Sequence, residues 1–218
     1  MLDPIEQRIL GVLIEKEATV PDTYPLTENA LRMGCNQSNN RDPVMELRDQ
    51  DMVDPLRSLL EKSWIARIDG GGRSTKWRHK AIERVGLTKS ELCVMCELLL
   101  RGPQAPGALK PRVQRLGYDA EPAEIEATLV RLASRPEPLV TLLPLGPRER
   151  DRRWAHRLAG DPLARAAEAP QSDAAMPAPS AAAIHGAPAL TLEARVAQLE
   201  QQVAELATSL RAITDALK

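Results

Sequence analysis

The chain has 218 residues, of which 43% are hydrophobic and only 2% are aromatic. That length is enough for one or two domains with a hydrophobic core. The 29 lysines and arginines nearly balance the 30 aspartates and glutamates, which gives a formal net charge of −1. This balance excludes an overall electrostatic attraction to nucleic acid or to an anionic membrane, so any such attraction must come from local patches.

The sequence lacks the features of a membrane or secreted protein. It contains no apolar run of the roughly 18 residues that a membrane-spanning helix needs, and residues 1–6 lack the basic start of a secretory signal. Three cysteines, Cys35, Cys93 and Cys96, imply no disulfide framework, because an odd number cannot pair fully. We therefore expect a cytoplasmic protein.

Residues 1–86 predict a first domain of helices closed by a hairpin. Asp3 precedes Glu6 by three residues and an apolar stretch follows, which is typical of a capped helix start. Two more helices and two strands are expected near residues 27–34, 51–63, 65–68 and 76–80.

Residues 87–160 repeat this order weakly and predict a second domain. Thr88 and Glu91 form the same capping pattern before another apolar helix. The later elements are expected near residues 106–116, 122–134, 139–143 and 153–157. A Trp-x-His strand flanked by basic residues closes each half. Three helices and a hairpin are the order of a winged helix-turn-helix, so the predicted fold class is mainly α (α+β winged helix), with two tandem domains.

The last part of the chain predicts a linker and a coiled coil. Residues 161–189 are rich in alanine and proline and lack apolar periodicity, as flexible linkers do. In residues 190–218, apolar side chains recur at alternating spacings of four and three. They are Leu192, Val196, Leu199, Val203, Leu206, Leu210, Ile213 and Leu217. Valine at a and leucine at d favour a parallel homodimer; the alternative is an amphipathic helix folded back on its own domain.

Three segments of the chain also resemble the YceH family of bacterial proteins: Pro21–Leu31, Cys35–Met45 and Leu98–Gln104. The resemblance covers roughly residues 2–160. It implies tandem winged-helix domains and a bacterial cytosol, and it supplies no catalytic residues. The third helix departs from the family in starting at residues 49–54 with Pro55 inside its first turns, which leaves the start of that helix open.

The hairpins carry the candidate nucleic-acid contacts. Side chains alternate across a strand, so Trp77 and His79 share one face while Lys76 and Arg78 share the other. The candidate phosphate-binding residues are Arg73, Lys76 and Arg78 in the first half and Arg148, Arg150, Arg152 and Arg153 in the second. The alternative is a solvated edge strand whose charges prevent edge-to-edge pairing.

Acidic residues crowd the start of both expected recognition helices, the end that normally meets base edges. They are Asp49, Asp51 and Asp54 in the first half and Glu121, Glu124 and Glu126 in the second. These carboxylates either repel phosphates or complement the helix dipole, by about 0.3–1 kcal/mol each. Both interpretations weaken the case for sequence-specific recognition in the major groove.

The amide-rich segment 35–43 is long for a connection between two helices. It is our candidate partner-binding loop, with Asn36, Gln37, Asn39 and Arg41 as contacts. Alternatively, its amides cap helix ends and satisfy backbone groups. Cys93 and Cys96 lack a second pair of ligands, which favours buried thiols over a metal or redox site. We expect no catalytic residue, metal site or cofactor.

These features predict a non-enzymatic protein that associates with duplex DNA through its basic wings, at low sequence specificity, in a regulatory or architectural role. The alternative is a protein–protein interaction scaffold that uses its winged-helix surfaces, the amide-rich loop and the acidic third helices, and that binds no nucleic acid.

Removing residues 190–218 should convert a dimer into a monomer, because the apolar seam spans fewer than four heptads and lies wholly in that segment. Analytical ultracentrifugation of the full and shortened chains at micromolar concentration measures the mass of each particle. An equal number of chains per particle before and after truncation would contradict the coiled-coil interpretation.

Overall fold

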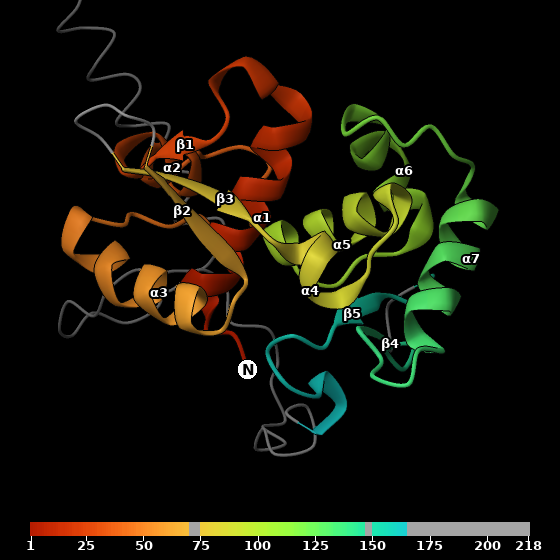
Figure 1. Cartoon of the computed structure of the whole chain (residues 1–218). Coiled ribbons are helices and arrows are strands. Elements are labelled where there is room, and N and C mark those ends of the chain that lie inside the picture. Colours follow the sequence, from red (N-terminus) through yellow and green to blue (C-terminus); the bar gives the residue numbers. More distant parts are fainter. Residues whose placement is uncertain (70–74, 147–149, 165–218) are drawn as a thin grey trace, which may run out of the picture. The chain divides into compact units, whose positions relative to one another are not determined.

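The computed structural model describes residues 1–69, 75–146 and 150–164 (Figure 1). The predicted coiled-coil seam and most of the predicted linker lie outside the described residues. Two of the candidate wing residues, Arg73 and Arg148, also lie outside them. Within the described part of the chain, no helix is long and apolar enough to cross a membrane. The fold is mainly helical and is completed by two small antiparallel sheets.

The first half contains the expected helices and hairpin, together with elements that the sequence did not predict. Its helices are α1 (Pro4–Thr19), α2 (Glu28–Cys35) and α3 (Asp49–Glu61), and its strands are β1 (Leu26–Thr27), β2 (Ile65–Asp69) and β3 (Thr75–His79). The strand β3 is central, with β1 and β2 antiparallel on either side. The unpredicted elements are β1, the short helix η1 (Pro21–Thr23) and the helix α4 (Ala81–Val85), which leads to the second half.

The second half repeats this order in a smaller form. Its elements are α5 (Lys89–Arg101), α6 (Pro106–Arg115), α7 (Pro122–Ala133), β4 (Val140–Leu142) and β5 (Trp154–His156). The strands β4 and β5 form an antiparallel pair. A single antiparallel bridge joins Gln104 to Trp154, where the first half pairs Leu26 with Trp77. In both halves, therefore, the segment after the first helix lies beside the tryptophan strand.

Capping explains where the first helix of each half begins. Asp3 accepts hydrogen bonds from the backbone of α1, and Glu6 accepts one from Asp3 N at 2.8 Å. Thr88 and Glu91 form the same reciprocal pair at α5, so both predicted capping boxes are confirmed. The start predicted for α3 was wrong by two residues: the helix begins at Asp49 and tolerates Pro55 in its interior, at the loss of one backbone donor.

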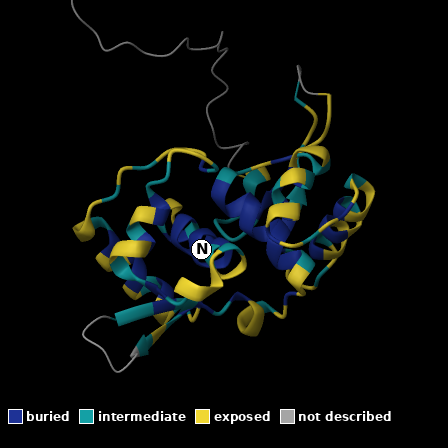
Figure 2. Cartoon of the chain, turned by 90° about the horizontal axis from the view of Figure 1, so that it is seen from above, coloured by how far each residue is buried: buried dark blue, intermediate teal, exposed yellow. Residues whose placement is uncertain are grey.

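The two halves pack together through α1 and α5, in which residues 8–15 and 91–100 are buried. Buried residues are drawn dark blue in Figure 2 and lie mainly in the helices at the centre of the view. Gly11 permits the close approach of these helices. A Cβ atom at this position would lie 2.8 Å from the Leu100 side chain and 3.3 Å from Cβ of Leu99. The Cys96 thiol donates a hydrogen bond to the Gly11 carbonyl across the same contact, at 3.4 Å. The α1–α5 contact is thus the centre of one continuous apolar core.

The tryptophan strands contribute large side chains to this core. In β3, Trp77 and His79 are buried while Lys76 and Arg78 are partly exposed, which confirms the predicted alternation. In β5, Trp154, Ala155 and His156 are all buried, so this short strand has no solvent-exposed face. Trp154 is 5% exposed, and its indole nitrogen donates to Glu126 Oε2 at 3.0 Å.

Replacing Trp154 by alanine should lower the free energy of unfolding by about 3–5 kcal/mol, the usual cost of truncating a buried aromatic side chain. Urea unfolding followed by circular dichroism measures the change. Replacing Val130, which is exposed on α7, by alanine is the matched control and should change stability by no more than about 0.5 kcal/mol. An unchanged midpoint for the Trp154 variant would mean that this side chain does not stabilise the second half.

Candidate nucleic-acid interface

In the first hairpin, formed by β2 and β3, one candidate arginine is already paired within the protein. Arg78 on β3 donates to Glu83 Oε1 at 2.7 Å and also to the backbone carbonyl of His79. Its charge is therefore compensated within the protein. Lys76 is partly exposed on the same strand. Among the side chains that the structure describes, no acidic group pairs with Lys76.

In the second hairpin, formed by β4 and β5, the described candidate arginines face solvent. Arg150, Arg152 and Arg153 are all exposed in the segment that leads into β5. Arg152 borders a hollow beside the first residues of α6 and α7, Pro106 and Pro122. Arg150 and Arg153 line a second, adjacent groove of about 400 Å³. The structure therefore places these three arginines around two neighbouring depressions.

This second depression, which we call the arginine groove, contains two further arginines that the sequence analysis missed. They are Arg101, the last residue of α5, and Arg112 on α6. The four arginines of the groove come from three separate segments, so no local pattern links them. A basic residue in the last turn of α5 was visible in the sequence, but such residues usually complement the helix dipole.

Gln104 assembles the arginine groove. Its backbone exchanges two hydrogen bonds with Trp154 of β5, at 2.8 and 3.0 Å. Its side-chain amide donates to the carbonyl of Glu97 on α5 at 2.9 Å, and its amide oxygen accepts from Arg112. This buried residue thereby connects α5, α6 and β5. The arginines consequently stand on elements that are held together from the interior.

The lining of the arginine groove has an excess of positive charge. Besides the four arginines, its charged side chains are Asp42 and Asp151. Burial, followed by the nearby charge of Arg101, lowers the pKa of Arg112 below its ordinary value. Crowded guanidinium groups attract anions, and each can present two parallel N–H donors to a phosphate. The groove is therefore suited to binding phosphate oxygens.

The acidic residues at the starts of α3 and α7 have partners within the protein. Asp51 accepts a hydrogen bond from the backbone of Arg48, as a cap of α3. Asp49 pairs with Arg32 at 2.6 Å, and Glu121 pairs with Lys110 at 2.7 Å. These contacts agree with the structural interpretation of the acids, which is that they stabilise the helix starts. They also leave negative charge at the helix ends that would face bases.

The amide-rich loop is held against the body of the protein. The side chain of Asn36 both donates to and accepts from the backbone of Leu47, at 2.8 Å each. Gln37 accepts from Arg41, which is buried, whereas Asn39 is exposed. Three of the four candidate contact residues thus serve the loop's own structure, and Asn39 is the one left facing solvent.

Arg41 belongs to a central ionic cluster, which we define as Glu15, Arg41, Glu97 and Arg115. Arg41 Nη2 lies 2.6 Å from Glu15 Oε2, and Arg115 Nη2 lies 2.7 Å from Glu15 Oε1 and 3.3 Å from Glu97 Oε1. The four residues come from α1, the loop, α5 and α6. The cluster therefore ties the loop and both halves together. The sequence analysis missed it, because its members are as much as 100 positions apart.

The two carboxylates of the cluster are held in different states. Burial alone would raise the pKa of Glu15, but hydrogen bonds and charge from Arg41 and Arg115 outweigh it and lower the pKa to about 2. Burial dominates at Glu97 and raises its pKa, and Oε2 of this residue has no hydrogen-bond partner among the described residues. Glu15 is therefore the firmly ionised member of the pair.

The histidine, cysteine and acidic side chains of the described residues do not cluster as metal ligands would, and the cysteines are buried. No group of three or more histidine, cysteine, aspartate or glutamate side chains is placed to hold a metal ion in the described part of the chain. All three cysteines are buried. Burial raises the pKa of Cys93 to about 11 and that of Cys35 to about 12, so both remain protonated thiols at neutral pH.

Comparison with known proteins identifies relatives along most of the chain. Residues 2–149 match the family model described as "Protein of unknown function, DUF480". A UPF0502 protein of Geobacter metallireducens is 42% identical over 203 residues, covering 93% of this chain and 89% of the relative. A UPF0502 protein of Shewanella halifaxensis is 40% identical over 220 residues, covering 98% of this chain and 99% of the relative. One from Vibrio vulnificus is 39% identical, covering 94% of each chain.

Replacing Glu15 by glutamine should destabilise the protein at neutral pH by about 3–5 kcal/mol, because the buried arginines lose their carboxylate partner. The folded state holds the pKa of Glu15 at about 2, below its ordinary value of 4.5. Its stabilisation is therefore complete above about pH 4.5 and is lost as the pH falls toward 2. Urea unfolding from pH 2 to 7 should show a flatter pH dependence in the variant.

The exposed Glu137, replaced by glutamine, is the control for that experiment and should keep the pH dependence of the unaltered protein. An E15Q variant whose stability falls with acid as steeply as that of the unaltered protein would show that another group is responsible.

Proposed function

The chain belongs to the DUF480 family, and we propose from its own geometry that it is a non-enzymatic protein of two tandem winged helix-turn-helix units that associates with duplex DNA. The role is regulatory or architectural. The observation that carries this proposal is the arginine groove, where Arg101, Arg112, Arg150 and Arg153 converge beside the second wing. We also take the DUF480 match and the resemblance to the YceH family to describe one family.

The order and pairing of the elements support the winged-helix assignment. Each half runs through a helix, a short paired segment, two further helices and an antiparallel hairpin. In winged helix-turn-helix proteins the third helix and the hairpin wing contact DNA. By this assignment α3 and α7 are the recognition helices, and the segments between β2 and β3 and between β4 and β5 are the wings.

The arrangement of charge supports contact with the DNA backbone, with little recognition of bases. Arginines at the second wing can displace counterions from phosphates, which favours binding at any sequence. The acidic first turns of α3 and α7 disfavour insertion of these helix ends between two phosphate strands. We therefore expect weak, sequence-tolerant and salt-sensitive association. A homodimer formed through residues 190–218 would carry two arginine grooves and would bind more tightly by avidity.

A protein-interaction scaffold is the second candidate, and the surface of α3 favours it for the first half. Val53 is 48% exposed and Leu60 is 41% exposed. They are seven residues apart on α3, so they share one helix face. Exposed apolar side chains on one face suit a protein partner better than a phosphate backbone.

Binding to a random-sequence duplex should weaken linearly in a plot of log affinity against log salt, with a slope of about −0.9 for each phosphate neutralised. Replacing Arg150 and Arg153 together by alanine should make this slope less negative by up to about 1.8 and weaken binding to unrelated duplexes by a similar factor. Fluorescence anisotropy between about 50 and 200 mM salt, the range where such contacts change most, measures both quantities.

The control variant is Arg84→Ala, which removes an exposed arginine of α4 that lies over the Trp64 ring and belongs to neither the groove nor a hairpin. It should leave the slope unchanged. Absence of any retention of duplex DNA by the unaltered protein at about 50 mM salt, where phosphate contacts are strongest, would overturn the DNA proposal in favour of the scaffold.

A further inference from the structure

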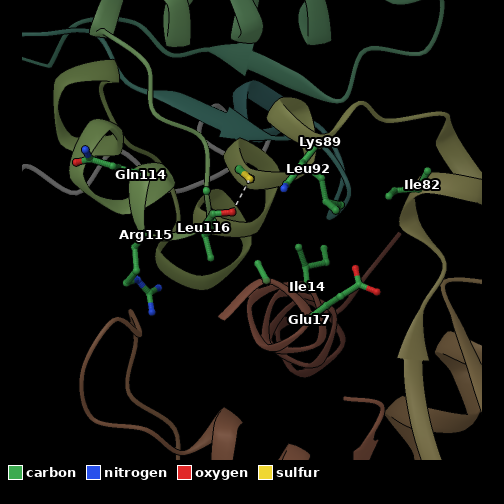
Figure 3. Close-up of a pocket in the computed structure, with 11 residues that line it drawn as sticks. Ile14, Glu17, Ile82, Lys89, Leu92, Gln114, Arg115 and Leu116 are labelled. Atoms are coloured by element: carbon green, nitrogen blue, oxygen red, sulfur yellow. Dashed lines mark hydrogen bonds between the residues drawn. The ribbon is translucent and has the colours of Figure 1, made fainter. Parts of the chain in front are cut away.

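A pocket of about 530 Å³ lies where the two halves meet, away from the arginine groove. It is bordered by α1, α4, the first turn of α5 and the last turn of α6 (Figure 3). Pockets of a few hundred Å³ with apolar walls and a few polar groups are typical of small-molecule sites. Nothing in the proposed DNA contact uses this pocket.

The floor of the pocket is apolar. Ile14 projects from α1 toward the side chains of Leu92 on α5 and of Leu116, which directly follows α6, and all three belong to the buried core (Figure 3). The exposed Ile82 of α4 completes one wall. The Cys93 thiol is also part of the lining and donates to the carbonyl of Leu116 at 3.6 Å. Because that carbonyl already accepts a hydrogen bond, an apolar ligand group can cover the floor without leaving it unpaired.

The charged side chains at the rim of the pocket differ in whether another residue already pairs with them. Glu17 is bound to His79 Nε2 at 2.7 Å, and Arg115 is bound to Glu15 and Glu97 of the central ionic cluster. Lys89 differs, because its ammonium group makes no hydrogen bond or ion pair with another described residue. It overhangs the pocket, 3.9 Å from where a Cβ atom on Gly117 would lie. The charge at the rim that still lacks a partner is therefore positive.

We propose that this pocket binds a small amphipathic monocarboxylate, with its apolar body on Ile14, Leu92 and Leu116 and its carboxylate on the ammonium group of Lys89. One ammonium group matches one carboxylate in charge. A phosphate dianion would require further donors, and the carboxylate of Glu17 on the same rim would repel it more strongly. The apolar body gains from removal of its surface from water.

Octanoate is a suitable probe, and 1-octanol is its uncharged counterpart. Titration of the full-length protein with octanoate, followed by methyl NMR, should shift the resonances of Ile14, Leu92 and Leu116 in a saturable way. Octanoate should bind about fivefold more tightly than octanol, the upper range for an exposed ion pair. The variant Lys89→Gln should remove this preference and leave the affinity for octanol unchanged.

Ala18 gives a second, independent variant, because it lies on the pocket wall but is exposed. Replacing it by phenylalanine should fill the pocket and abolish the shifts from both probes. Ala127→Phe, at an exposed position on α7, is the matched control and should bind both probes normally.

Absence of saturable shifts at Ile14 and Leu92, or equal binding of octanoate by the unaltered, A18F and K89Q proteins, would overturn the proposal. The experiment contains no DNA, so its outcome is independent of the arginine groove.

Discussion

The contact between α1 and α5 is the interaction on which the rest of the structure depends. A helix that is apolar nearly all round is stable only when it is buried on every side. Each of these two helices packs on one side against the other helix and on its remaining sides against elements of its own half. Gly11 lets their backbones approach, since any side chain there would overlap Leu100. The first helix of each half therefore contributes to one hydrophobic core that the two halves share.

Burial of these helices places carboxylates in the interior, and other elements must supply positive charges to compensate them. Each helix carries a glutamate into the interior, Glu15 on α1 and Glu97 on α5, and an unpaired buried carboxylate costs several kcal/mol. Arg41, in the amide-rich loop, and Arg115, on α6, both form ion pairs with Glu15. A further buried arginine on α1, Arg8, donates to the carbonyls of Cys35 and Pro43 at the two ends of the loop. The path of the loop is thus a consequence of charge compensation in the core.

The same core positions both candidate sites. The helix α5 carries Lys89 of the pocket between the two halves in its first turn, Glu97 of the central ionic cluster in its third and Arg101 of the arginine groove at its end. Gln104 bonds to the carbonyl of Glu97 and to Arg112, so the groove is built directly onto the cluster. The proposed ligand and DNA sites therefore share one rigid helix, although they are chemically independent.

Local sequence signals predicted the local features of this fold. The capping boxes at Asp3 and Thr88 depend on residues three positions apart, and the alternation around Trp77 depends on neighbours in one strand. The strand β1 escaped prediction because two residues carry too little pattern and their pairing with β3 is a long-range contact. Arg41 was assigned to the surface for the same reason: its carboxylate partner lies 26 positions away.

The distribution of partners explains how a chain with a net charge of −1 can support a local basic site. In the first half, the basic side chains of Arg32, Arg41 and Arg78 each have an acidic partner within the protein. In the second half, Lys110 and Arg115 are paired in this way, whereas the lining of the arginine groove contains four arginines and two aspartates. Coulomb energy falls with distance and is screened beyond about 8–10 Å, so a phosphate responds to this local excess and not to the overall charge. This asymmetry supports assigning the proposed DNA contact to the second half, and it leaves the exposed apolar face of α3 in the first half as the surface suited to a protein partner.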